Sequence, residues 1–158
     1  MAKETMAEWF ERAKVDGDAI EDLFDQVLSA KGYNVVRASR HDDFFKHIDL
    51  YVNGIGIDVK SRRRLDQIWL EMVNNNGNKG WLQGEAEYIA FHFAKYNHFK
   101  VFRREDLRKF VEENVTETSK NSKEYLKYYT REHWGKKDKL VKVKYNHIKH
   151  LYHFIVKC

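Results

Sequence analysis

The chain has few or none of the residues and apolar runs that are typical of disulfide-bonded, secreted and membrane-spanning proteins. Its 158 residues include no proline and a single cysteine, Cys158. One cysteine excludes an internal disulfide framework and is typical of a reducing compartment. No apolar run approaches the ~18 residues of a membrane-spanning helix, and residues 1–14 lack the apolar segment of a signal peptide. We therefore expect a cytoplasmic protein that makes no contact with a membrane.

Aromatic residues, in contrast, are abundant. Ten phenylalanines, nine tyrosines and four tryptophans favour a packed core over disorder. A chain of this length suits one domain, which buries roughly 70% of the surface that its unfolded form exposes. We expect a single domain over residues 1–158, with a core at about 18–115 and a basic, aromatic-rich extension at about 116–158.

The net charge of +5 conceals a strong asymmetry along the chain. Residues 1–94 carry 12 Lys and Arg against 16 Asp and Glu, whereas residues 95–158 carry 17 against 8. Such an asymmetry indicates a polyanionic partner, of which nucleic acid is one. A solvated basic face without a partner explains the charge alone equally well.

Apolar periodicity predicts helices at both ends of the proposed core. A first helix at 5–14 is expected to break at residues 16–18, after which Asp18 caps a second helix that Gly32 ends near Lys31. The second helix carries an apolar stripe on one side. That stripe consists of Ile20, Leu23, Phe24, Val27 and Leu28. Another amphipathic helix is expected at 104–114.

The remaining apolar segments read as strands. They lie at 33–39, 47–60, 68–73, 86–94, 99–102 and 141–145. Residues 116–139 are expected to be irregular, and the last ten residues fit either a helix or a strand. This order predicts an α/β domain in which helices flank one central mixed β-sheet.

Residues 47–60 form the most informative segment. Asn53-Gly54 between two β-rich runs predicts a hairpin with a two-residue turn, in which paired residue numbers sum to 107. One side of this hairpin is then entirely apolar, and we expect it to face the core. That side holds Ile48, Leu50, Val52, Ile55, Ile57 and Val59.

The opposite side of the hairpin places Asp49 directly across from Asp58, with Lys60 two residues further along. Facing carboxylates repel each other, so a purely structural arrangement would avoid them. A divalent cation such as Mg²⁺ removes the repulsion, and Lys60 can orient a water or neutralise developing charge. The alternative is that all three residues decorate the solvated side of an amphipathic sheet.

Asp49 followed by Asp58-Val59-Lys60 resembles the signature of the PD-(D/E)xK nuclease superfamily, with Ile48 where the motif has proline. The stretch 69–91 also resembles segments of uncharacterised phage-type members. The resemblance covers about residues 18–103. It implies a restriction-endonuclease-like core and Mg²⁺ (or Mn²⁺) held by Asp49, Asp58 and the main-chain carbonyl of Val59.

The superfamily commonly adds a glutamate from the first helix, and Glu21 matches it. Glu21 also lies closer to the apolar stripe of its helix than Asp22 or Asp25 does, so it can reach the edge of the sheet. An ordinary solvated glutamate is the alternative.

Further candidates follow the motif. Arg62, Arg63 and Arg64 could clamp a nucleic-acid backbone, or form a solvated loop. Glu71 shares a strand face with Trp69 if Leu70 and Met72 face the core, and an edge strand would expose it harmlessly. Gln83 could orient a water or a phosphate.

By resemblance, the chain is expected to be a Mg²⁺-dependent endonuclease, a hydrolase that cuts phosphodiester bonds of DNA in preference to RNA. It would work in the cytoplasm, which is that of the host if the chain is phage-encoded. Cutting both strands would need a second site, which a homodimer could supply. The alternatives are a non-catalytic nucleic-acid-binding protein and a protein-interaction module that keeps the nuclease fold.

Overall fold

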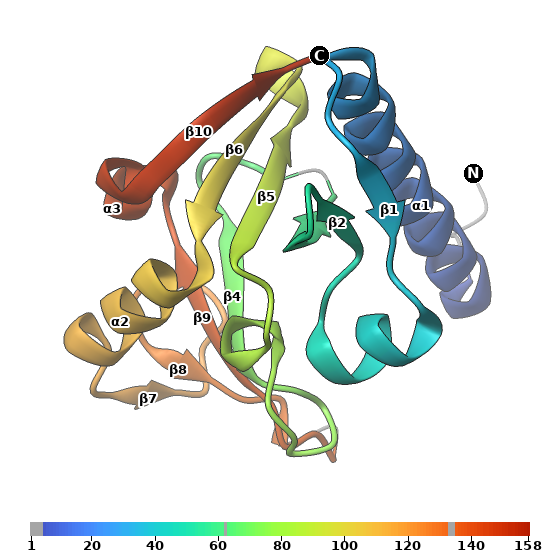
Figure 1. The fold of residues 1–158 in the computed structure, drawn as a ribbon. Helices are drawn as coiled ribbons and strands as arrows, with labels where there is room; N and C mark the ends of the chain where they lie inside the picture. The colour runs from blue at the N-terminus through green and yellow to red at the C-terminus, as the bar shows by residue number, and fades with distance from the viewer. Residues whose placement is uncertain (1–4, 62, 133–134) are drawn as a thin grey trace.

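The computed structural model describes residues 5–61, 63–132 and 135–158 (Figure 1). The helical elements are α1 (Met6–Ala30), the π-helix η1 (Asp42–Lys46), η2 (Trp81–Gln83), η3 (Ala94–Tyr96), α2 (Arg104–Asn114), α3 (Tyr145–Ile148) and η5 (Lys149–Leu151). The strands are β1 (Val35–Arg37), β2 (Leu50–Val52), β3 (Ile55–Lys60), β4 (Ile68–Val73), β5 (Tyr88–Phe93), β6 (His98–Arg103), β7 (Thr118–Ser119), β8 (Tyr128–Tyr129), β9 (Lys139–Val143) and β10 (Tyr152–Lys157). The chain is therefore α/β with mixed sheet, as expected.

The N-terminal helix α1 is continuous, so the expected break at residues 16–18 is wrong. Thr5 and Glu8 form a capping box, in which each side chain accepts the backbone N–H of the other. Gly17 lies inside the helix, where a glycine costs only about 1 kcal/mol relative to alanine, and packing of the following turns offsets that loss. The helix ends as expected, with Lys31 as its cap and Gly32 at φ +90°.

Six strands form the main sheet, in the order β1-β2-β3-β5-β6-β10. Strands β3 and β5 pair in parallel, and every other neighbouring pair is antiparallel. Helix α1 covers one face of this sheet by burying its predicted stripe (Figure 1). The core on that side includes Ile20, Phe24, Leu28, Leu50, Ile57, Val59 and Phe99.

A second sheet covers the other face, so the prediction of one central sheet flanked by helices is wrong in this respect. Its strand order is β4-β9-β8-β7. All six residues of β5 are buried, and an apolar strand with two buried faces needs a cover on each of them. Strands β4 and β9, with Leu107 and Val111 of α2, supply the second cover.

The basic segment 116–158 contributes strands to both sheets. Part of the stretch expected to be irregular forms β7 and β8, and β9 pairs with β4. The last residues form β10, which pairs with β6 at the edge of the main sheet. No helix of the described residues is both long enough and apolar enough to cross a bilayer.

The β2–β3 hairpin has the predicted register and turn. Leu50 pairs with Ile57 and Val52 with Ile55, while Asn53 and Gly54 adopt φ of 48° and 82°. The prediction fails at Ile48, which lies on the opposite side of the sheet from Leu50 and belongs to the core under the second sheet.

The departure of Ile48 has a local cause. His47 has φ 54°, a left-handed conformation that turns the chain away from β3 before Ile48. The Ile48 side chain then fills the space beside Gly56, where an added Cβ would lie 2.9 Å from Ile48 Cδ1. At the other end of the hairpin, Ile55 is exposed rather than in the core.

Candidate functional site

The two aspartates of the hairpin meet, as their register predicts. Asp58 is buried on β3, and its Oδ1 lies 3.0 Å from Lys60 Nζ. The Asp49 amide donates to the Ile57 carbonyl at 2.9 Å, and Asp49 Oδ2 accepts the Val59 N–H at 2.7 Å. Because Ile48 has left the ladder, the Asp49 carboxylate serves as acceptor for Val59 and is pinned beside Asp58.

The Asp49 and Asp58 carboxyl groups lie within hydrogen-bonding contact of each other. Burial, followed by the charge of Asp58, raises the pKa of Asp49 to about 8. Burial also raises the pKa of Asp58, although Lys60 opposes the shift. The alternative that these residues decorate a solvated face is wrong for Asp58, which is only 3% exposed. The pair therefore takes up a proton more readily than free aspartates do, and a cation would relieve the same repulsion.

One oxygen of this pair has no donor. Asp58 Oδ2 is buried and has no hydrogen-bond partner among the described residues, and the Asp49 carboxyl beside it can donate only when it is protonated. A buried carboxylate oxygen without a donor is unfavourable and calls for a specific explanation. A proton or a metal ion between the two carboxylates would provide one.

Glu21 of α1 joins the same group of carboxylates. Burial, the charge of Asp49 and a hydrogen bond with Asp49 raise the pKa of Glu21 to about 8. Its Oε2 also lies 3.2 Å from Arg37 Nη1 on β1. Sequence reasoning thus placed Glu21 correctly beside the pair but missed Arg37, since a single arginine in a short strand carries no motif.

An open cleft of about 390 Å³ reaches Glu21 and Asp49 of this group from solvent, while Asp58 lies behind them and does not line it. It is lined by Asp18, Glu21, Asp22, Arg37, Ala38, Ser39, Arg40, Asp43 and Asp49. Acidic side chains of α1 and η1 line it together with Arg37 and Arg40, and Arg37 forms ion pairs with Glu21, Asp22 and Asp25 of α1. Such a cleft can admit a cation together with a phosphate that contacts Arg40.

The fit of a metal ion depends on few ligands. Within the described ranges, no three or more His, Cys, Asp or Glu side chains gather into an ion-binding group. Two carboxylates do converge, one with an oxygen lacking a donor, and hard oxygen ligands suit Mg²⁺, which keeps several waters. Glu21, the third carboxylate, is held by Arg37. The residues fit a two-carboxylate site completed by water.

Lys60 is fixed by a residue that sequence reasoning missed. Its Nζ lies 4.7 Å from the centre of the Trp81 ring, and Trp81 is buried in η2. The ammonium group thus has Asp58 on one side and an aromatic face on the other. The only signal in the sequence was a tryptophan directly after the turn-rich stretch 74–80.

Glu71 and Gln83 support η2 rather than reaching the carboxylates. As predicted, Leu70 and Met72 of β4 face the core. Glu71 Oε1 accepts the Trp81 N–H at 3.3 Å, and Gln83 Nε2 donates to the Met72 carbonyl at 2.6 Å. Both side chains thereby fix the loop that presents Trp81 to Lys60.

The three arginines do not share one environment. Arg62 lies outside the described residues. Arg63 is half-buried, with its guanidinium 5.9 Å from the Phe91 ring, and burial lowers its pKa while Asp58 opposes that shift. Arg64 is exposed and binds Asp66 through two hydrogen bonds of 3.1 and 3.0 Å. Arg63 therefore adds a positive charge near Asp58, whereas Arg64 points elsewhere.

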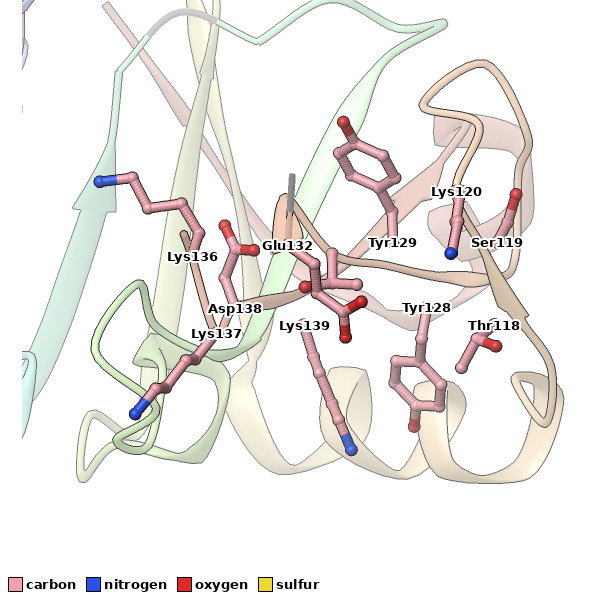
Figure 2. Close-up of a pocket in the computed structure, with 11 residues that line it drawn as sticks. Thr118, Ser119, Lys120, Tyr128, Tyr129, Glu132, Lys136, Lys137, Asp138 and Lys139 are labelled. Carbon is pink, nitrogen blue, oxygen red and sulfur yellow. The ribbon is translucent and has the colours of Figure 1, made fainter. Parts of the chain in front are cut away.

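A second cavity of about 560 Å³ lies in the second sheet, between β7, β8 and the start of β9. Figure 2 shows Lys139 and Tyr128 side by side, with Lys120 on the far side of Glu132. Lys136 and Lys137 point away from this group in the same view. The exposed carboxylate of Glu132 stands among the lysines, so the cavity is a mixed basic surface rather than an enclosed anion site.

Comparisons of the chain with protein-family models, curated proteins and solved structures find no match. The resemblance to the nuclease superfamily therefore rests on Asp49, Asp58 and Lys60 and on their placement. Within the described residues, the arrangement that calls for chemistry is the buried carboxylate pair with a lysine beside it.

Proposed function

We propose that the chain is a nuclease that hydrolyses phosphodiester bonds with the help of a divalent cation, Mg²⁺ or Mn²⁺. The observation that carries this proposal is the donor-less, buried Asp58 Oδ2 beside the Asp49 carboxyl. Two carboxylates in contact repel each other unless nearby positive charge compensates them. Such a pair therefore favours uptake of a proton or of a metal ion. A cation in that position relieves the repulsion without a change in the fold.

The residues that would hold the ion are the side chains of Asp49 and Asp58 and the main-chain carbonyl of Val59. Glu21 would also bind the ion if its carboxylate left Arg37. A divalent cation in such a site supplies Lewis acidity and lowers the pKa of bound water. Waters would complete the coordination, as is usual for Mg²⁺.

Lys60 is the residue that we expect to act directly on the reacting groups. Its Nζ is held between Asp58 Oδ1, at 3.0 Å, and the Trp81 ring, at 4.7 Å. A positive charge fixed in this way can orient the attacking water or neutralise charge that develops on the phosphate. Arg40, which lines the cleft, is placed to contact a flanking phosphate.

The order of the elements supports a restriction-endonuclease-like core. Helix α1, strand β1 and the β2–β3 hairpin follow one another, and the acidic residues lie on the hairpin as the resemblance implies. We propose an endonuclease that prefers DNA to RNA and that forms a homodimer if it cuts both strands.

One observation favours a second candidate, a nucleic-acid-binding module without catalysis. Arg37 and Lys60 already provide positive charge to Glu21 and Asp58, as they would in a purely structural cluster. In that case binding would survive chelation and the loss of Asp58, and no cleavage would be detected.

The test is cleavage of supercoiled, linear and branched DNA, and of RNA, in Mg²⁺, Mn²⁺ or EDTA. We expect cleavage that depends on the cation and is lost in Asp58→Asn and Lys60→Ala. Asp66→Asn, which removes an exposed carboxylate bound to Arg64, is the matched control and should cleave normally. Mg²⁺ should also raise the melting temperature of the wild type but not of Asp58→Asn.

Cleavage that persists in EDTA would overturn the proposal. So would equal activity of the wild type and both variants, or the absence of any cleavage by wild-type protein that is shown to be folded.

A further inference from the structure

Two phenylalanines of η1 are exposed side by side. Phe44 and Phe45 are 74% and 66% exposed, more than any other large apolar side chain of the described residues. Their ring centres lie 4.9 Å apart in an edge-to-face arrangement, and the His41 ring lies 4.9 Å from Phe45. Large aromatic rings gathered in solvent indicate a surface that a partner covers.

The element that carries these rings, η1, borders the open cleft of about 390 Å³, although neither ring lines it. Asp43, which directly precedes Phe44, lines that cleft together with Glu21 and Asp49. The charge of Asp43 is also felt at Asp58. A molecule bound over the carboxylates therefore extends towards Phe44 and Phe45.

The segment that carries the rings is anchored at both ends. At its start, Asp42 Oδ2 accepts the Tyr51 hydroxyl at 2.6 Å, and the Asp42 N–H donates to Ser39 Oγ at 3.1 Å. At its end, the Lys46 carbonyl accepts the Glu85 N–H at 2.9 Å. The segment η1 is thus fixed to β2 and to the loop before β5, so its backbone loses little conformational entropy when a partner binds.

The surroundings of the rings identify the kind of partner. Every neighbour along the chain is polar or charged, and the set consists of Arg40, His41, Asp42, Asp43 and Lys46. The core of a protein interface is depleted of charged residues, whereas a nucleobase stacks on one or two aromatic faces among charged neighbours. Arg40 in the adjoining cleft supplies a contact for phosphate.

We infer that Phe44 and Phe45 form a stacking platform for an unpaired nucleobase of the substrate. This inference rests on the proposed function, because that function identifies the ligand of the cleft as nucleic acid. It specifies the substrate as one with a single-stranded or unpaired nucleotide next to the bond that is cut. Bases inside an intact duplex do not offer a free face.

The test compares binding of a labelled single strand, a forked duplex and a blunt duplex, in EDTA and in Ca²⁺. The variants are Phe44→Ala/Phe45→Ala and, as the matched control, Phe44→Leu/Phe45→Leu, which keeps apolar surface but removes the rings. We expect the alanine variant to bind the single strand and the fork about 5- to 150-fold more weakly, with blunt-duplex binding unchanged. The leucine variant should not recover the loss.

A direct readout is the fluorescence of 2-aminopurine placed at the unpaired position. Stacking should quench it with the wild type and not with either variant. Because both rings are exposed, the melting temperature should not fall in the variants, so a loss of binding is not a loss of folding.

Equal binding by the wild type and the alanine variant would overturn the inference, as would rescue by leucine, which would indicate an apolar protein contact. Failure of the wild type to bind the single strand or the fork would also overturn it. If the protein cleaves and its binding does not depend on the Phe44 and Phe45 rings, only the stacking inference is wrong. If binding depends on these rings but no cleavage occurs, only the nuclease proposal is wrong.

Discussion

At the scale of single residues, the carboxyl groups of Asp49, Asp58 and Glu21 are unusual because burial raises the pKa of each, and contact with a neighbouring aspartate raises the pKa of Asp49 and Glu21 further. An acid with a raised pKa binds its proton more tightly in the folded protein than in the unfolded chain. Its contribution to stability is therefore complete below the ordinary pKa and is lost as the pH rises through the raised value.

We accordingly predict that, in EDTA, the melting temperature of the wild type falls as the pH rises from near 3.8, the ordinary value for Asp49, to about 8. Beyond that range the carboxylates are charged and repel one another. Mg²⁺ added at pH 8 should restore the melting temperature, since it binds the folded state. Differential scanning fluorimetry across this pH range measures both effects.

The control is Asp49→Asn/Asp58→Asn, in which amides replace two of the titrating groups. Its melting temperature should depend less on pH across the same range and should not respond to Mg²⁺. A wild type whose stability is constant over this range, or a variant with the same slope, would contradict the assignment of the raised pKa values.

At the scale of elements, two glycines should respond in opposite ways to alanine. A Cβ at Gly17, inside α1, would meet nothing within 4 Å, whereas one at Gly80 would lie 2.5 Å from the Glu71 carbonyl oxygen. We predict that Gly17→Ala raises the free energy of unfolding by about 1 kcal/mol. Gly80→Ala should lower it by about 1–3 kcal/mol, because β4 and η2 must separate.

Urea denaturation measures both changes. Gly80→Ala should also reduce cleavage, since η2 carries Trp81 and hence positions Lys60. A destabilised Gly17→Ala would argue that α1 is interrupted at this position, as the sequence alone suggested. A neutral Gly80→Ala would contradict the close approach of β4 and η2.

The elements also show what sequence reasoning can reach. The register of the hairpin was predictable because Asn53-Gly54 determines it within a few residues. The meeting of Asp49 and Asp58 follows from that register. The continuation of α1 through Gly17 and the turn of Ile48 to the other face were not predictable, because packing against distant strands decides both.

The surroundings of the carboxylate pair were harder to predict than the residues that form the pair. Periodicity identified β4 and β9 as strands. It did not show that they pair with each other in a separate sheet, because such pairing depends on contacts between residues far apart in the sequence. The contact of Lys60 with Trp81 depends on η2, which β4 holds in place. The closeness of the two aspartates was therefore predictable, while their dielectric surroundings and supporting residues were not.

At the scale of the whole molecule, the balance of charge differs between the two layers. Acidic side chains of α1 and η1 line the cleft at the main sheet, whereas Lys120 and Lys139 lie on the second sheet. A polyanion that crosses from one layer to the other would meet phosphate-binding charge on one side and the carboxylates on the other. Binding should then be dominated by the release of counterions from the polyanion where its phosphates meet these lysines.

We predict that nucleic-acid affinity falls steeply with salt, and that Lys120→Gln/Lys139→Gln reduces the steepness. Each lysine that contacts a phosphate contributes about 0.7–0.9 to the slope of log K against log salt, so the double variant should lose up to about twice that amount. The matched control is Lys31→Gln at the end of α1, far from β7 and β8 in Figure 1. Fluorescence anisotropy over a range of NaCl concentrations measures the slopes.

An unchanged slope in the double variant would place the phosphate contacts outside this part of the second sheet. An affinity that does not depend on salt would contradict any electrostatic role of residues 95–158 in binding.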